Sequence, residues 1–110
     1  MHGYHQHQSC IEACLKCAAI CNHCASSCLQ GDMVQMMAKC IQLDMECAAL
    51  CYTAAQVMSM GGQTANELCK ICADACDACA AECSQHEDDH CKECAEACRK
   101  CAEECRKMAA

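Results

Sequence analysis

The stretch CKECAEACRKCAEEC, residues 91–105, places a cysteine at every third or fourth position in steps of 3-4-3-4. An α-helix has about 3.6 residues per turn, so steps averaging about 3.5 residues keep all these thiols on one face of one helix. Residues 69–83 repeat the steps 3-4-3-4, and residues 10–28 follow 4-3-4-3-4. The spacing therefore predicts helices that each present a continuous stripe of cysteines to a common axis.

Glycine-containing and polar breaks divide the chain into four helical segments. The expected helices run from a cap at Ser9 to Gln30, from a cap at Asp32 to about Met60, from a cap at Thr64 to about Gln85, and from the polar break 86–90 to about Met108. Because the connections are short, neighbouring helices should be antiparallel. The sequence predicts an all-α fold, an antiparallel up-down-up-down four-helix bundle with a cysteine-lined core, as a single domain over residues 1–110. Residues 1–8 are expected to form a flexible His-containing tail.

The second segment departs from the cysteine stripe. Its seam positions are Met33, Met37, Cys40, Asp44, Cys47, Cys51, Ala54 and Met58. Its other faces are also apolar, through Ile41, Met45, Leu50, Tyr52 and Val57. A helix that is apolar all round is buried on both sides. We therefore expect a homo-oligomer packed through this segment.

Composition excludes several classes of protein. Eight basic residues stand against fifteen acidic ones, and Phe and Trp are absent, which excludes a nucleic-acid-binding protein. No apolar run approaches the roughly 18 residues of a membrane span. The N-terminus lacks the features of a signal peptide, so we expect a cytoplasmic protein whose thiols stay reduced. No base–nucleophile pair stands out, and we do not expect an enzyme.

Nineteen cysteines in 110 residues indicate metal binding. The candidate ligands are Cys10, Cys14, Cys17, Cys21, Cys24, Cys28, Cys40, Cys47, Cys51, Cys69, Cys72, Cys76, Cys79, Cys83, Cys91, Cys94, Cys98, Cys101 and Cys105. Cu(I) fits best, because it is soft and selects thiolates. With bonds of about 2.3 Å, a linear two-coordinate ion separates two sulfurs by about 4.6 Å, a span that residues i and i+4 can close. Each Cu⁺ also neutralises one thiolate, so a filled core carries little net charge.

Other uses of the thiols are weaker interpretations. Disulfides within one helix would require distortion, because the Cβ atoms of residues i and i+4 are about 5–6 Å apart. Iron–sulfur motifs lie on irregular loops, and tetrahedral zinc needs four ligands per isolated ion. Two alternatives stay open: a thiol redox reservoir, and zinc or cadmium sequestration by the same thiols.

Several other side chains are candidate accessory ligands. The antiparallel order of the helices brings four further candidates to one end of the bundle: Met33, Met37, His86 and His90. They either form a mouth that captures copper or, equally, the methionines plug the bundle and the histidines are solvated loop residues. His23 flanks the stripe and is more typical of a surface residue. Asp44 lies in the stripe, where it ligates metal or bonds a thiol, or else occupies an edge reached by water. The histidines of the tail are interpreted as solvated.

The repeated C-x₂-C-x₃-C pattern on four helices, with CNHC at residues 21–24 and the stretch 91–105, resembles the bacterial four-helix-bundle copper storage proteins of the cytosolic type. The resemblance covers nearly the whole chain. It implies a homotetramer of bundles, each holding many Cu(I) ions in its core for storage, detoxification or both. The low thiol content of the second segment departs from a uniform stripe.

Overall fold

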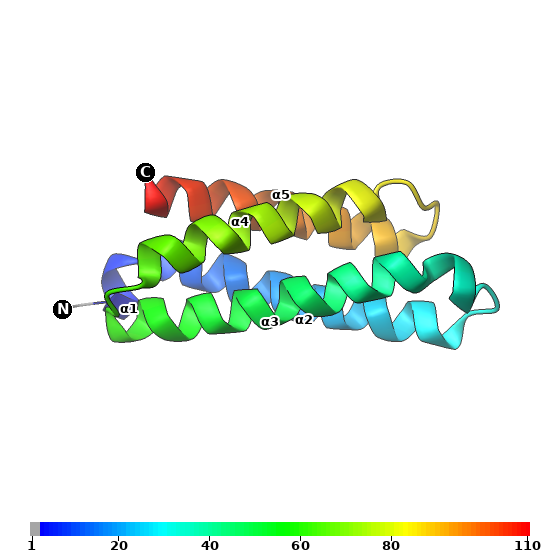
Figure 1. The fold of residues 1–110 in the computed structure, drawn as a ribbon, viewed down its shortest axis with the longest axis horizontal. Helices are drawn as coiled ribbons and strands as arrows, with labels where there is room; N and C mark the ends of the chain where they lie inside the picture. The colour runs from blue at the N-terminus through cyan, green and yellow to red at the C-terminus, as the bar shows by residue number, and fades with distance from the viewer. Residues whose placement is uncertain (1–2) are drawn as a thin grey trace.

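The computed structural model describes residues 3–110. Its elements are α1 (Gly3–Gln6), α2 (Gln8–Gln30), a short 3-10 helix η1 (Val34–Met37), α3 (Ala38–Met60), α4 (Ala65–Cys83) and α5 (Asp89–Ala109). The four long helices lie side by side in alternating directions, with both termini at the same end (Figure 1). Helix α2 contacts α3 and α5, and α4 contacts the same two helices, so the four enclose one axis. The predicted antiparallel four-helix bundle is confirmed.

The end of α3 follows the predicted glycine signal. Gly61 adopts a left-handed conformation with φ 68°. Its N–H donates to the carbonyl of Met58 at 3.1 Å, and the N–H of Gly62 donates to that of Val57 at 2.9 Å. These two bonds form a Schellman motif, which satisfies carbonyls that the last helical turn leaves free. Gly31, by contrast, ends α2 in an extended conformation with φ −84°.

The side-chain caps predicted at Ser9, Asp32 and Thr64 are wrong, because none of these side chains makes a capping hydrogen bond. Ser9 lies inside α2, which begins one residue earlier and has His7 at its N-cap, and no side chain caps α2. The Asp32 segment forms the tighter η1, so α3 begins only at Ala38. Thr64 is the N-cap of α4, but its hydroxyl makes no capping bond. Side-chain capping bonds therefore do not fix the starts of α2, α3 and α4.

Residues 3–8 differ from the flexible tail that the sequence predicted. The N–H of His7 donates to the carbonyl of Gly3 at 3.0 Å, which closes the turn of α1. Gly3 is buried, and a Cβ at this position would collide with the carbonyl of Met58 and the backbone of Gly61. Only glycine allows α1 to approach the end of α3 so closely. Met1 and His2 lie outside the described residues.

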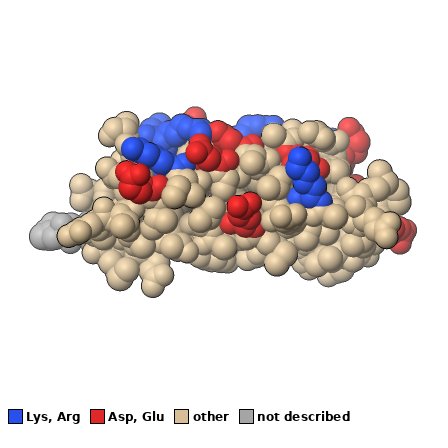
Figure 2. Space-filling view, in the orientation of Figure 1, with Lys and Arg blue, Asp and Glu red and all other residues tan. Residues whose placement is uncertain are grey.

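All nineteen cysteines are buried, and small alanines flank them. The buried flanking alanines include Ala18, Ala25, Ala73, Ala80, Ala95 and Ala102. Small side chains let the helices approach until sulfur atoms fill the axis. Charged groups gather over α4 and α5, whereas the side of α2 and α3 is nearly free of them in this view (Figure 2). Among residues 3–110, no helix combines the length and apolar character that crossing a bilayer requires.

The two helix-ending glycines provide a stability test. Replacing Gly61 with Ala should lower the free energy of unfolding of the metal-free protein by about 1–2 kcal/mol, because an L-residue pays this for a left-handed conformation. Gly31→Ala is the control: its φ suits any residue, and the nearest atom to an added Cβ is 3.7 Å away. Urea unfolding followed by circular dichroism measures both. Equal losses in the two variants would contradict the Schellman assignment.

Candidate metal centre

The thiols form an unbroken ladder along the bundle axis. Within each long helix, sulfurs at i and i+4 lie 3.9–4.0 Å apart, as in Cys17–Cys21, Cys47–Cys51 and Cys94–Cys98. Contacts between helices are as short or shorter: 3.4 Å for Cys40–Cys83, 3.5 Å for Cys51–Cys72 and 3.6 Å for Cys14–Cys101. Thiols such as Cys17, Cys47 and Cys51 thus have sulfur neighbours on other helices as well as on their own, which the sequence pattern alone does not specify.

These distances differ from the linear clamps that the spacing suggests. A linear ion with bonds of about 2.3 Å separates its sulfurs by about 4.6 Å, whereas three sulfurs around a trigonal ion lie about 4.0 Å apart. The observed separations match the trigonal figure without movement of the backbone. Linear coordination remains within reach of small changes in side-chain rotamers. The core thus offers ions two or three sulfurs drawn from more than one helix.

Groups of four cysteines overlap instead of standing apart. Sulfurs that all lie within 4.8 Å of one another form these groups: Cys14, Cys51, Cys72 and Cys101; Cys17, Cys51, Cys76 and Cys101; Cys17, Cys21, Cys47 and Cys98; Cys21, Cys79, Cys94 and Cys98; Cys24, Cys28, Cys40 and Cys91. Five residues each belong to two of these groups: Cys17, Cys21, Cys51, Cys98 and Cys101. A sulfur that serves two groups must bridge ions. The arrangement therefore favours a continuous metal–sulfur cluster over separate tetrahedral sites.

Two thiols at the His-bearing end, those of Cys28 and Cys91, are held in their protonated form when no metal is bound. Burial raises the pKa of Cys28 to about 11. Burial likewise raises the pKa of Cys91. Both thiols are therefore neutral near pH 7 until a metal displaces the proton. A neutral thiol behaves as a small apolar group, so Cys28 and Cys91 pack in the metal-free core without a buried charge.

Asp44 is the one charged side chain buried among the described residues. Its Oδ1 accepts hydrogen bonds from the thiols of Cys79 at 3.1 Å and Cys94 at 3.2 Å, with Cys83 at 3.5 Å. The exposed fraction of Asp44 is 0%, so it does not occupy the water-reached edge considered from the sequence. Desolvation raises the pKa of Asp44 to about 10, which keeps the carboxyl neutral in the metal-free core.

Of the predicted mouth residues, His90 reaches the thiols directly. Its Nε2 lies 3.4 Å from the Cys28 sulfur. His86 instead contacts Glu82 at 3.0 Å. Met37 is buried at this end of the core, whereas Met33 is exposed. The structure therefore separates the four candidates into one residue in contact with the stripe, one plug and two residues outside it.

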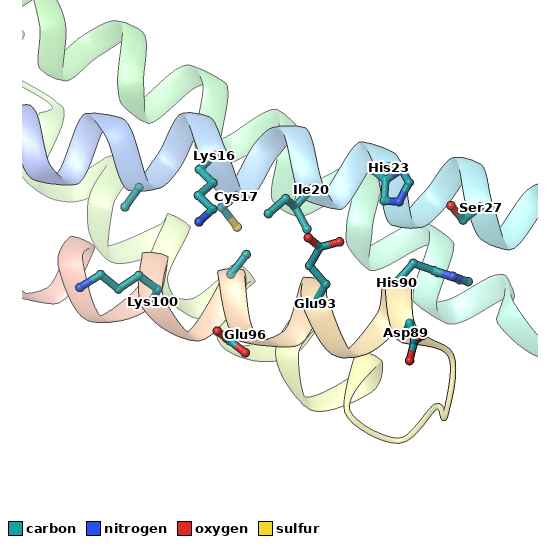
Figure 3. A pocket seen from close by; sticks show the side chains of 12 residues that line it. Lys16, Cys17, Ile20, His23, Ser27, Asp89, His90, Glu93, Glu96 and Lys100 are labelled. Atoms are coloured by element: carbon teal, nitrogen blue, oxygen red, sulfur yellow. The ribbon is translucent and has the colours of Figure 1, made fainter.

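His23 lies in a groove between α2 and α5 and is exposed. The groove has a volume of about 870 Å³. Figure 3 shows His23 and His90 on facing helices towards one end, with Lys16 and Lys100 towards the other. His23 therefore faces this groove at the surface, consistent with the surface role that its flanking position indicated.

One sulfur contact was not among the predicted ligands. Met58 is fully buried, and its Sδ lies 3.5 Å from the Cys69 sulfur. The sequence could have identified this ligand, because Met58 lies at a seam position in the same register as Cys47 and Cys51 on α3. A thioether is a soft donor of the same kind as thiolate. Met58 thus extends the sulfur ladder at the end opposite His90.

Comparisons with known proteins converge on one family. The model of the copper storage protein family, Csp, matches residues 4–110. An uncharacterised cysteine-rich protein of Bacillus subtilis, YhjQ, is 47% identical over 103 residues, covering 94% of this chain and 95% of its own.

Two solved structures share the fold closely. The Cu(I)-bound copper storage protein BsCsp3 is 47% identical, with a TM-score of 0.90, over 94% of this chain and 97% of that one. A cytosolic copper storage protein from Streptomyces lividans, described with five coppers, is 37% identical, with a TM-score of 0.92, over 97% of this chain and 94% of that one.

Asp44 should make stability depend on pH. Its folded pKa is raised, so the folded state holds a proton that the unfolded chain releases above about pH 4. The buried carboxyl of Asp44 therefore destabilises the metal-free protein increasingly as the pH rises from about 4.5 to 7.5. Asp44→Asn should gain a few kcal/mol relative to the parent across this range. Urea unfolding at several pH values measures the difference, and a difference that does not change with pH would contradict the buried neutral carboxyl.

Proposed function

Because this chain belongs to the copper storage protein family, we propose that it binds many Cu(I) ions through the thiolates of its buried cysteines and stores them in the cytoplasm. Its role is to bind and hold metal rather than to catalyse a reaction. The cytoplasmic location is supported by its similarity to a cytosolic copper storage protein of Streptomyces lividans. All nineteen cysteines, with Asp44 and Met58 beside them, are the proposed lining of the store.

The overlap of the four-cysteine groups carries this proposal. Shared sulfurs such as Cys17 and Cys51 suit a metal that accepts bridging thiolates with two or three ligands. Charge supports the same metal. One Cu⁺ per thiolate leaves the filled core close to neutral, whereas separate Zn²⁺ ions with four thiolates each would leave a buried negative charge at every site. Cu(I) therefore satisfies both the geometry and the electrostatics of the core.

The end that holds His90 is the proposed mouth. An imidazole binds Cu(I) less tightly than a thiolate does, so His90 can capture an ion and pass it to Cys28, 3.4 Å away. Cys28 shares a group with Cys24, Cys40 and Cys91, which leads into the ladder. Met33, Met37 and His86 surround this route as secondary ligands. The transfer ends with Cu(I) on thiolate and the thiol proton released to solvent.

The exposed apolar face of α3 supports a homo-oligomer, a tetramer by family resemblance. Met45 is 59% exposed and Tyr52 46% exposed in the single chain. The Tyr52 hydroxyl accepts a hydrogen bond from the Asn22 amide at 3.4 Å, which joins this face to α2. The charge-poor side of α2 and α3 continues it (Figure 2). Apolar surface of this kind is normally covered by a partner, and a second copy of the chain brings the same charge-poor face.

Titration of the reduced, metal-free protein with Cu(I) against a chromophoric chelator tests the function. We expect roughly one Cu(I) per cysteine, in the high teens per chain, because bridged ions and thiolates are equal in number. A plateau near four or five ions would indicate isolated tetrahedral sites and favour zinc or cadmium sequestration. Failure to bind Cu(I), together with rapid and reversible loss of free thiols under mild oxidant, would instead favour the redox reservoir.

Removing the imidazole of His90 tests the mouth. His90→Ala should slow Cu(I) uptake by about tenfold, the order of effect seen when a supporting metal-site residue is lost, and leave the final capacity almost unchanged. His23→Ala is the matched control: His23 lines the same groove as His90, but among the described residues it makes no hydrogen bond to a thiol, so the rate should stay as it is. Stopped-flow transfer from a chelator complex gives both rates. Equal slowing by the two variants would contradict a mouth at His90.

A further inference from the structure

A second group of metal-binding side chains surrounds the bundle end opposite His90. A cavity of about 630 Å³ there is lined by His5, His7, Cys10 and Met108. These supply two imidazoles, a thiol and a thioether. Cys10 is 3% exposed and belongs to the buried ladder. The cavity thus places soft ligands from outside the core against the first thiol of α2.

Backbone contacts hold the histidines over this cavity. Gly3 packs against the end of α3 at a distance that only glycine permits. The carbonyl of Gly3 accepts from the N–H of His7 at 3.0 Å, and the carbonyl of His7 accepts from the N–H of Ile11 at 2.9 Å. Ile11 is itself 1% exposed. Both histidines are therefore carried on a segment fixed at its two ends, which is the requirement for a preformed site.

Sulfur contacts lead from this cavity into the core. The Cys10 sulfur lies 3.7 Å from that of Cys105, which lies 3.6 Å from that of Cys14. Cys14 in turn belongs to the group with Cys51, Cys72 and Cys101. An ion on Cys10 is thus one short step from a bridging cluster, as an ion on Cys28 is at the opposite end.

Charge at the cavity favours a cation. Its wall includes the carboxylates of Glu12 and Glu104 and the ammonium group of Lys107. Lys107 contacts Glu104 at 3.5 Å and Glu103 at 3.8 Å, and Lys100 contacts the same two carboxylates at 3.2 Å and 3.7 Å, so these four charges balance. The carboxylate of Glu12 accepts a hydrogen bond at 3.0 Å from the Gln8 amide, a neutral partner that adds no positive charge to the wall. The net field of the wall therefore attracts Cu⁺.

We propose that His5, His7 and Met108 form a second port for Cu(I), which passes the ion to Cys10 at the end opposite His90. The proposal rests on the proposed storage function. The imidazoles and the thioether hold Cu(I) transiently because they are weaker ligands than thiolate. Transfer breaks these bonds and forms a Cu(I)–thiolate bond on Cys10, whose proton leaves to solvent. With two ports, both halves of the ladder load from their own ends.

Uptake kinetics in a background without the first mouth test this port. The His86→Ala/His90→Ala protein is mixed with the Cu(I)–bicinchoninate complex, and the loss of colour gives the rate. Adding His5→Ala/His7→Ala should lower the remaining rate by about fivefold or more, with capacity unchanged. Adding Gln6→Ala instead is the control, because Gln6 lies between the two histidines, lines the same cavity and has no metal-binding group. Circular dichroism checks that each variant keeps its helicity.

Thiol protection gives an independent readout. One equivalent of Cu(I) is added to the otherwise unmodified protein, and free thiols are alkylated at once with iodoacetamide and mapped by mass spectrometry. Cys10 and Cys105 should be protected as early as Cys28 and Cys91, and His5→Ala/His7→Ala should abolish the early protection of the first pair only.

Three results decide the matter. Slower uptake together with loss of Cys10 protection in the histidine variant supports the port. Copper uptake with unchanged rate and unchanged Cys10 protection in that variant overturns the port and leaves the storage function standing. No copper uptake by any protein, including the parent, overturns the storage function and the port together.

Discussion

The contact of thiol with thiol along one axis is the constraint on which this structure depends. A helical repeat of about 3.5 residues sends every cysteine to the same seam, and flanking alanines let the seams of four helices meet. Sulfurs then lie 3.4–4.0 Å apart from end to end, as the Cys40–Cys83 and Cys72–Cys76 contacts show. Without metal these contacts are weak hydrogen bonds between sulfur atoms. With a soft cation the same geometry becomes a chain of bridging thiolates.

Helix α3 differs from the other long helices, because its seam is not made of cysteines throughout. Asp44 occupies a seam position where a thiol would otherwise stand, and it gathers Cys79, Cys83 and Cys94 around one carboxyl oxygen. A carboxyl held neutral by burial adds a hydrogen-bonding centre without adding charge to the metal-free core. On its outward face α3 exposes the large apolar side chains Met45, Tyr52 and Met60. The helix with the fewest thiols is thus the one that supports the proposed contacts between subunits.

The sequence was sufficient for the bundle and for its thiol lining, because heptad spacing depends only on positions within each helix. It was insufficient where distant segments meet. The caps predicted at Ser9 and Asp32 failed, since α1 and η1 continue the chain into helical turns there. The docking of Gly3 on α3 is a tertiary contact with no local signature. The seam register placed Met58 on the inner face of its helix, but it did not show that the Met58 sulfur meets Cys69. The complete burial of the Asp44 side chain likewise depends on all four helices together.

We propose that copper in this protein forms a continuous cluster bridged by thiolates. X-ray absorption at the copper K-edge of the fully loaded protein tests that claim most directly, because it reports the oxidation state, the ligand atoms and neighbouring metals in one measurement. The account predicts Cu(I) with a first shell dominated by two or three sulfurs, and a second shell of nearby copper atoms. A first shell dominated by nitrogen or oxygen, or isolated copper sites without metal neighbours, would contradict it.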